Sequence, residues 1–381
     1  MNENMTALTR NMFDMATSRE MSVRDAVVML EDCAKFRKFS DKLKAFEKGR
    51  DLRPLLVEGL LSNNPEAKRE AVDRKVRNWL ADRQSSISKI DAIELCFVLG
   101  LTPAEAEAFV AMVSEEGFHW RNPEELIYIY ALENGMSYPE AKALRNEIMS
   151  KVKLTAETED IAPDSFTSVI KADMGRIGSV DELAEYIIGA EKRLGEKHNS
   201  AYTLFMEMME HLESPALEDW FESDRAYTCG EIVRYYLHRN ELPDITDKSR
   251  QNAMSAIQRS IAANWPSEST LSRMKNRHTD VNRKVMILLF LATYDVEEEL
   301  DTDEFYDLPD PDSDGDEAFR EFYGKMNSML EYSGFSPLDP RSPFDWMTIY
   351  CLCGEDIYEL DSQLSDFLSD LFRDFGNELQ D

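Results

Sequence analysis

Residues 117–135 read GFHWRNPEELIYIYALENG, and residues 334–354 read GFSPLDPRSPFDWMTIYCLCG. Both stretches contain Gly-Phe, then Arg-x-Pro, then Ile-Tyr-x-Leu. From Arg121 and Arg341 onward, the matching positions differ by a constant 220. An ordered set of motifs that occurs twice in one chain indicates a duplicated structural unit. We therefore expect the same arrangement of helices to be built twice.

A second pair of stretches extends this repeat toward the N-terminus. Residues 82–99 read DRQSSISKIDAIELCFVL, and residues 276–293 read NRHTDVNRKVMILLFLAT. Here Lys89 matches Arg283, and the offset is 194. Because the order of the blocks is the same in both places, we define repeat 1 as residues 40–150 and repeat 2 as residues 265–355.

The fold class that the sequence predicts is all-α. Apolar residues recur at helical spacing along most of the chain, and glycine and proline are sparse, with 15 and 14 among 381 residues. Helix start signals are frequent: Ser88 precedes one apolar run, and Ser137 is followed three residues later by Glu140. Gly100 stands where the helix that starts after Ser88 should end.

Composition places the chain among globular proteins, with 43% apolar and 10% aromatic residues. No stretch reaches the ~20 apolar residues that cross a bilayer, and the N-terminal residues lack a signal-peptide pattern. The five cysteines are an odd number without the spacing of a zinc site, which is typical of free thiols in a reducing compartment. We expect a cytoplasmic protein that does not bind membranes.

Charged residues are unevenly distributed along the chain. Residues 1–153 carry 23 Lys and Arg and 25 Asp and Glu, whereas the remaining residues carry 20 and 49, so almost all of the formal charge of −31 lies in the second half. A polar, acidic segment separates the two parts. The domains that we expect are a flexible N-terminus (1–21), a helix-turn-helix-like domain (22–153), a linker (154–164) and an acidic helical domain (165–381). The last contains a degenerate second copy and an acidic insert at 295–317.

The segment 66–89 predicts a polar helix with an apolar stripe and basic side chains outside it, then a polar turn and an apolar helix. This order, with the Gly-Phe and Arg-x-Pro tail, resembles the lambda-repressor-like helix-turn-helix proteins of xenobiotic-response-element type, in a Firmicutes form with a helical C-terminal extension. The resemblance implies a non-enzymatic bacterial transcriptional regulator that reads base edges and holds phosphates of double-stranded DNA. The DNA-contacting residues that it implies are Arg69, Arg74, Lys75, Arg77, Asn78, Arg83, Ser85 and Lys89.

A basic helix is equally typical of a packing module with a solvated face. In repeat 2, the acidic surroundings oppose a polyanion, and packing or partner contact is the favoured interpretation. The alternative function is an acidic protein-interaction module, or nucleic-acid mimic, that binds a basic protein surface through the acidic half. A homodimer formed through the acidic half is a further expectation. We also expect the two copies to pack on each other, because duplicated modules often reuse a homodimer-like interface.

One segment matches the spacing of a calcium loop. Residues 310–321 read DPDSDGDEAFRE, with carboxylates at positions 1, 3, 5 and 12 and glycine at position 6. In so acidic a segment the match arises easily, so a solvated acidic linker is the favoured interpretation. We find no glycine-rich phosphate loop, nucleophile–histidine motif, HExxH motif or zinc-ligand spacing in the sequence, and we expect neither enzymatic activity, nor a metal, nor a cofactor.

Overall fold

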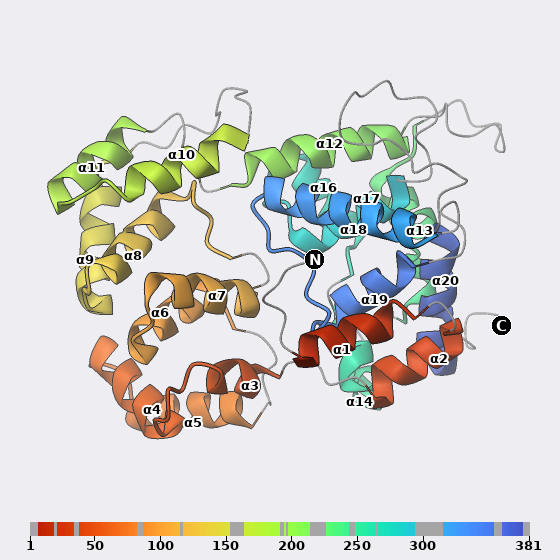
Figure 1. Ribbon diagram of the computed structural model, residues 1–381, viewed down its shortest axis with the longest axis horizontal. Coiled ribbons are helices and arrows are strands. Elements are labelled where there is room, and N and C mark those ends of the chain that lie inside the picture. Colours follow the sequence, from red (N-terminus) through yellow and green to blue (C-terminus); the bar gives the residue numbers. More distant parts are fainter. Residues whose placement is uncertain are drawn as a thin grey trace. The chain divides into compact units, whose positions relative to one another are not determined.

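The regular secondary structure that a computed structural model describes is entirely helical (Figure 1). The chain forms two compact units. The repeat-1 unit contains residues 37–200 and Tyr332–Ser336, and the repeat-2 unit contains the remaining residues. The structure describes residues 7–18, 21–33, 38–81, 87–114, 117–152, 164–190, 194–195, 197–213, 226–243, 248–263, 265–293, 315–353 and 360–375. The all-α fold class is confirmed for these residues.

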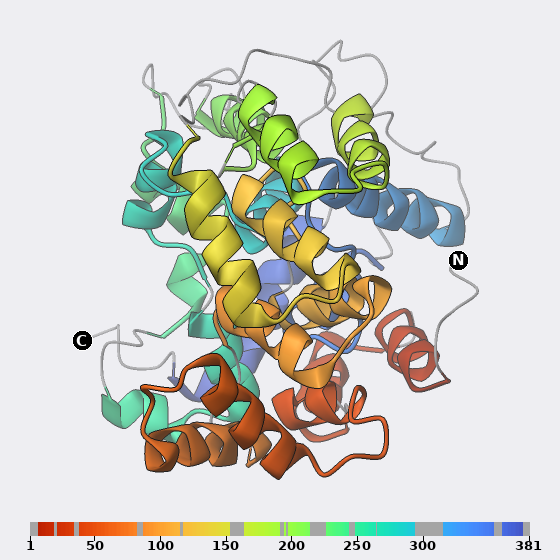
Figure 2. The same ribbon diagram turned by 90° about the vertical axis from the view of Figure 1, so that its left-hand side faces the viewer.

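In the repeat-1 unit, successive helices pack against one another. α4 lies against α5 and α6, α6 against α7, α7 against α8, and α8 against α9 (Figure 1, Figure 2). The helices are α3 (Phe39–Lys44), α4 (Leu52–Asn63), α5 (Arg69–Leu80), α6 (Lys89–Leu99), α7 (Pro103–Ser114), α8 (Pro123–Glu133), α9 (Tyr138–Met149), α10 (Asp164–Met174) and α11 (Val180–Gly189).

The helix ends follow the signals in the sequence. The Ser88 side chain accepts the backbone N–H of Asp91 at the start of α6, and Gly100 ends that helix with a φ of 61°, which glycine adopts without strain. Ser137 and Glu140 form the predicted capping box of α9. These local predictions are confirmed because capping depends only on residues within one turn of the helix.

Three helices are buried on nearly every side. In α8 every residue from Leu126 to Ala131 is buried, and α17 (Arg283–Thr293) and α19 (Pro343–Cys351) show the same all-round burial. A helix that is apolar on all faces is stable only inside a core. α8 therefore lies inside the core of the repeat-1 unit, and α17 and α19 lie inside the core of the repeat-2 unit.

The repeat-2 unit draws on both ends of the chain. α19 packs against α1, α15 and α20, and α2 packs against α20. The helices are α1 (Ala7–Ala16), α2 (Val23–Val28) with a π-helical turn (Met29–Cys33), α12 (Asn199–Glu213, whose first two residues belong to the repeat-1 unit), α13 (Cys229–Tyr235), α14 (Lys248–Ala253), α15 (Ala256–Ala263), α16 (Glu268–Lys275), α17, α18 (Gly315–Tyr332), α19 and α20 (Leu360–Leu371), with 3₁₀ turns at Arg239–Glu241 and Arg373–Phe375.

The N-terminal residues differ from the expected flexible segment 1–21. Residues 7–16 form α1, Met12 is 1% exposed, and the indole Nε1–H of Trp346 donates to the Met12 carbonyl at 3.0 Å. The Tyr350 hydroxyl also donates to the carbonyl of Met21. Residues 7–16 complete the core around α19 through a long-range contact that local sequence patterns do not reveal.

The unit boundaries also differ from the expected domains 22–153 and 165–381. Residues 22–36 belong to the repeat-2 unit, whereas residues 164–200 belong to the repeat-1 unit. The latter are held there by α11, which packs on α9, and by an ion pair of 3.1 Å between Lys171 and Glu107. Most of the expected linker 154–164, namely residues 154–163, lies outside the described residues.

We predict that Leu56→Ala lowers the free energy of unfolding of the repeat-1 unit by about 2–5 kcal/mol, because Leu56 is fully buried and its loss leaves a cavity. Urea unfolding followed by circular dichroism measures the change. Leu55→Ala, on the partly buried side of the same helix, is the matched control and should cost less. Equal losses for the two variants would contradict the packing of α4 described above.

Candidate functional site

The predicted DNA-contacting segment forms a helix pair. α4 and α5 pack against each other and are joined by residues 64–68. α5 buries Val72, Val76 and Trp79, and the Trp79 ring meets Phe39 edge-on at 5.9 Å. This buried stripe turns the remaining side chains of α5 toward the solvent.

Most of the basic side chains of α5 form ion pairs with carboxylates. The carboxylate partners come from α4, α5 and α6, so they lie on the same surface as the cations. The pairs are Arg69 with Glu58 (2.6 Å), Lys75 with Asp91 (2.8 Å) and Arg77 with Asp73 (3.3 Å), and Arg53 also binds Asp73 (2.9 Å).

The other predicted site residues lie differently. Arg74 is exposed, and within the described part of the chain no ion pair or hydrogen bond involves it. Asn78 is half-buried on the same helix. Arg83 and Ser85 lie outside the described residues. Among the predicted DNA-contacting cations that the structure describes, Arg74 is thus the one without a carboxylate partner.

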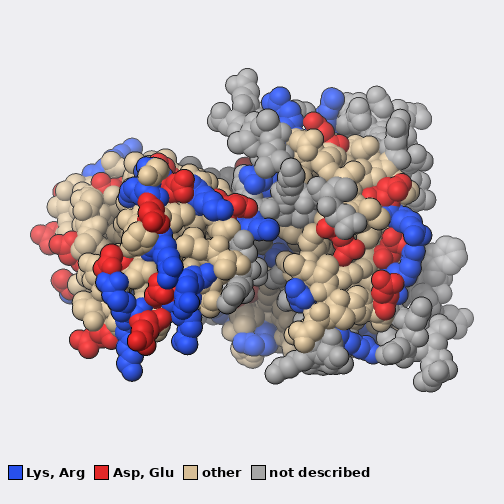
Figure 3. Space-filling model, turned by 90° about the horizontal axis from the view of Figure 1, so that it is seen from below, with Lys and Arg blue, Asp and Glu red and all other residues tan. Residues whose placement is uncertain are grey.

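The surface around α4 and α5 is therefore mixed in charge. Figure 3 shows Lys and Arg alternating with Asp and Glu over the end of the repeat-1 unit that carries these helices. Exposed ion pairs are individually weak, about 0–1 kcal/mol, so phosphate could displace a carboxylate partner. The displaced carboxylate would remain beside the phosphate, however, and repel it. Among the described residues, the cations of this surface alternate with carboxylates and do not form the contiguous positive patch that attracts a polyanion.

Lys89, the last predicted contact, is directed inward. It is the first residue of α6, and its ammonium lies 2.9 Å from the carboxylate of Glu125, the third residue of α8, with both side chains largely buried. The backbone N–H of His119 donates to the second carboxylate oxygen at 2.7 Å. Burial raises the pKa of Glu125, and the Lys89 charge opposes that rise. In this structure Lys89 joins two helices of the core.

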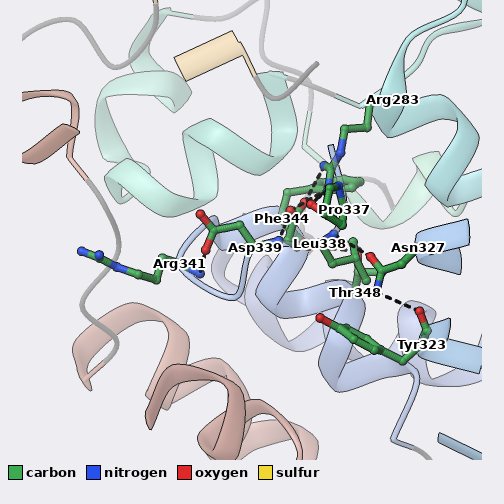
Figure 4. A network of polar contacts seen from close by, with 10 residues as sticks. Arg283, Tyr323, Asn327, Pro337, Leu338, Asp339, Arg341, Phe344 and Thr348 are labelled. Atoms are coloured by element: carbon green, nitrogen blue, oxygen red, sulfur yellow. Dashed lines mark hydrogen bonds and ion pairs between the residues drawn. The ribbon is translucent and has the colours of Figure 1, made fainter. Parts of the chain in front are cut away.

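Repeat 2 contains the same arrangement. Arg283, the first residue of α17, makes two hydrogen bonds of 2.8 Å to Asp345, the third residue of α19, and both side chains are at most 3% exposed. The backbone N–H of Asp339 donates to Asp345 at 2.8 Å. Arg283 also donates to the Pro337 carbonyl at 3.1 Å, and Figure 4 shows this network.

The two networks match position by position. Lys89 and Arg283 differ by 194, the offset of the second pair of stretches, and Glu125 and Asp345 differ by 220, the offset of the first pair. A cation at the first residue of a helix is unfavourable to the helix dipole, whereas a carboxylate in the first turn is favourable. In each repeat, the carboxylate therefore offsets the unfavourable position of the cation at the start of its helix. The sequence analysis missed both carboxylates, although their equal spacing from Arg121 and Arg341 would have identified them.

Asn327 of α18 extends the network of repeat 2. Its side-chain oxygen accepts the backbone N–H of Leu338 at 2.7 Å, and its amide donates to the carbonyl of Tyr323 at 2.9 Å (Figure 4). These bonds fix the segment that leads to α19. The arrangement supports packing, because each polar group named here is bonded to another group of the protein.

The described residues contain no group of three or more His, Cys, Asp or Glu side chains that could hold a metal ion. The calcium-like segment is described only from Gly315, where α18 begins, so its first three aspartates lie outside the described residues. Among the helices that the structure describes, none is long and apolar enough to cross a membrane.

Comparison with known proteins gives no match: no protein-family model fits the chain, and no curated protein and no solved structure is similar to it.

We predict that Arg283→Met destabilises the repeat-2 unit by about 3–5 kcal/mol, because Asp345 would keep a buried charge without its cation. The double variant Arg283→Met, Asp345→Leu should lose less than either single variant, since no charge is then left unpaired. Urea unfolding of the four proteins measures the coupling.

Lys151→Met is the control for the loss of a cation at the surface. Its ion pair with Glu147 is exposed, so the change should be at most about 1 kcal/mol. A double variant that is destabilised by the sum of the two single changes would contradict the assignment of Arg283 and Asp345 as one energetic unit.

Proposed function

We propose that this protein is a non-enzymatic, cytoplasmic interaction protein. It would use two helix-turn-helix-like repeats as a scaffold and bind a basic, partly apolar surface of another protein. The structure describes five basic residues among the predicted DNA contacts. Four of them lie against carboxylates, and only Arg74 does not. This pairing is the observation that carries the proposal. The formal charge of −31 adds a long-range field that attracts cationic partners.

α11 offers a surface of suitable chemistry. Leu183 and Ile187 are buried, which leaves the opposite face of the helix outward. That face contains Asp181 and Glu185, both exposed, and Ile188, which is 36% exposed. Carboxylates beside an exposed aliphatic side chain complement an amphipathic segment that carries Lys or Arg next to apolar residues.

We predict that an amphipathic peptide of Leu and Lys binds the full chain and that added salt weakens this binding. The double variant Asp181→Lys, Glu185→Lys should bind it at least about 10-fold more weakly, since two attractive charges become repulsive. Fluorescence anisotropy measures the affinity.

The matched control, Asp14→Lys with Glu210→Lys, changes the net charge equally at exposed positions of other helices. Equal losses for both double variants would show that only net charge matters and would remove α11 from the proposal. Absence of peptide binding at low salt would refute the interaction function itself.

DNA binding is the second candidate function, because α4 and α5 form a helix pair and Arg74 is exposed on it. Under the interaction proposal, we expect no salt-dependent binding of mixed-sequence duplex DNA. Binding that falls steeply with salt and is lost in the double variant Arg74→Ala, Arg77→Ala would instead establish a DNA-contacting helix. The same anisotropy measurement on the full chain distinguishes the two functions.

A further inference from the structure

α6 presents a strip of three side chains that the core leaves at the surface. Ile90 is 46% exposed, and Glu94 and Phe97 are half-buried. The three positions are four and three residues apart, so their side chains lie along one face of the helix. The strip therefore places one carboxylate between an aliphatic and an aromatic side chain.

The Glu94 carboxylate has no ion pair with any residue that the structure describes. Its hydrogen-bond donor is the neutral amide of Asn63 on α4, at 3.2 Å. Lys75 of α5 binds Asp91 at 2.8 Å and lies over the ring of Trp79, so its ammonium is already engaged. Within the described part of the chain, a neutral amide is thus the only direct partner of a half-buried charge.

Several other carboxylates that face neighbouring helices of the repeat-1 unit have a cation of the chain as partner. The pairs are Glu125 with Lys89, Asp91 with Lys75 and Glu124 with Arg145. Charge-assisted pairs of this kind are stronger than a hydrogen bond from a neutral amide. Glu94 differs from these carboxylates, because no cation among the described residues binds it.

The surroundings of Glu94 leave its charge poorly compensated. Burial raises the pKa of Glu94 and Asp91 adds to the rise, whereas the Asn63 hydrogen bond and the charges of Lys75 and Lys142 together lower it by less. Lys142 of α9 is exposed and forms no ion pair or hydrogen bond within the described residues. A cation in contact with the carboxylate favours the charged form of Glu94, which burial opposes.

Aromatic rings border the strip at Phe97. The Phe97 ring lies 5.5 Å from that of Tyr138 and meets Tyr128 edge-on at 6.4 Å. Both tyrosines are buried, so Phe97 is the ring of this cluster that reaches the surface. Burial, Tyr128 and then the charge of Glu94 raise the pKa of Tyr138, which places the carboxylate near the rings.

We propose that the strip of Ile90, Glu94 and Phe97 binds an arginine side chain of the basic partner, with the guanidinium on the Glu94 carboxylate. A guanidinium donates two parallel hydrogen bonds to a carboxylate, and its flat face stacks on an aromatic ring such as that of Phe97. Its alkyl stem packs on apolar side chains such as Ile90.

The strip favours arginine over lysine. A guanidinium is less strongly hydrated than an ammonium, so it enters a half-buried site at a lower cost. The nature of the partner rests on the proposed function, whereas the site itself depends only on α6 and its neighbours.

The test is an NMR titration of the full chain, labelled on its phenylalanine rings, with the amide of Nα-acetyl-arginine as probe. We expect the Phe97 signals to shift and to saturate as the probe binds. The citrulline analogue has the same shape without the charge, and it should bind at least about 10-fold more weakly. The lysine analogue should also bind more weakly than the arginine probe.

Glu94→Gln keeps an oxygen for the Asn63 hydrogen bond and removes the charge, so it should weaken arginine binding at least about 10-fold. Glu70→Gln is the matched control. Glu70 is exposed on α5 and has no partner among the described residues, so this variant loses the same charge and should bind the probe as the wild type does. Lys142→Met removes a cation that acts on Glu94 and should strengthen binding.

Equal weakening by Glu94→Gln and Glu70→Gln would overturn the proposal, and so would a citrulline probe that binds as tightly as arginine. A lysine probe of equal affinity would overturn the assignment to arginine. If Glu94→Gln does not fold, Lys142→Met decides, because unchanged affinity in that variant would place the probe away from Glu94.

The arginine probe is independent of the amphipathic peptide. Binding of the probe without binding of that peptide would refute the interaction function and leave this site in place. Equal peptide binding by the wild type and Glu94→Gln, together with no shift of the Phe97 signals by the probe, would remove the site and leave the function in place.

Discussion

The buried pair of a cation and a carboxylate is the interaction on which both repeats depend. In each, a helix begins with a basic residue, and a second helix receives that charge on the third residue of its first turn, as Lys89 does with Glu125 and Arg283 with Asp345. A backbone N–H from the preceding turn binds the same carboxylate. Because either charge alone would be costly to bury, the pair fixes how the two helix starts meet.

The pairing of cations with carboxylates also determines the charge of the surface that the sequence suggested for DNA. A helix-turn-helix protein that binds DNA directs its cations outward, but Lys89 is directed into the core. Arg69 and Lys75 of α5 pair with carboxylates of neighbouring helices, and Arg77 pairs with Asp73 of its own helix. The acidic residues are thus part of the same surface that the sequence suggested for DNA. For an interaction protein that binds cationic partners, such pairing is no disadvantage, because the negative net charge supplies the attraction.

The sequence predicted what depends on neighbouring residues. Helix class and the caps at Ser88 and Ser137 follow from patterns within a few residues, and the structure confirms them. The division into units was not predictable in this way. The N-terminal helix joins the repeat-2 unit through Trp346, and α10 and α11 join the repeat-1 unit, by contacts between residues far apart in the chain. His119 and His198 carried no motif, since their pairing arises only when the two segments meet.

The two repeats differ at the residue whose backbone N–H binds the buried carboxylate. His119 of repeat 1 matches Asp339 of repeat 2, and both donate a backbone N–H to the carboxylate of the buried pair. Only the histidine adds a side chain that stacks on His198. Phe335, whose ring meets His198, belongs to a segment that ends at Ser336, and the next residue, Pro337, accepts a hydrogen bond from Arg283. One peptide bond therefore joins the segment that contains Phe335 to the polar network of repeat 2.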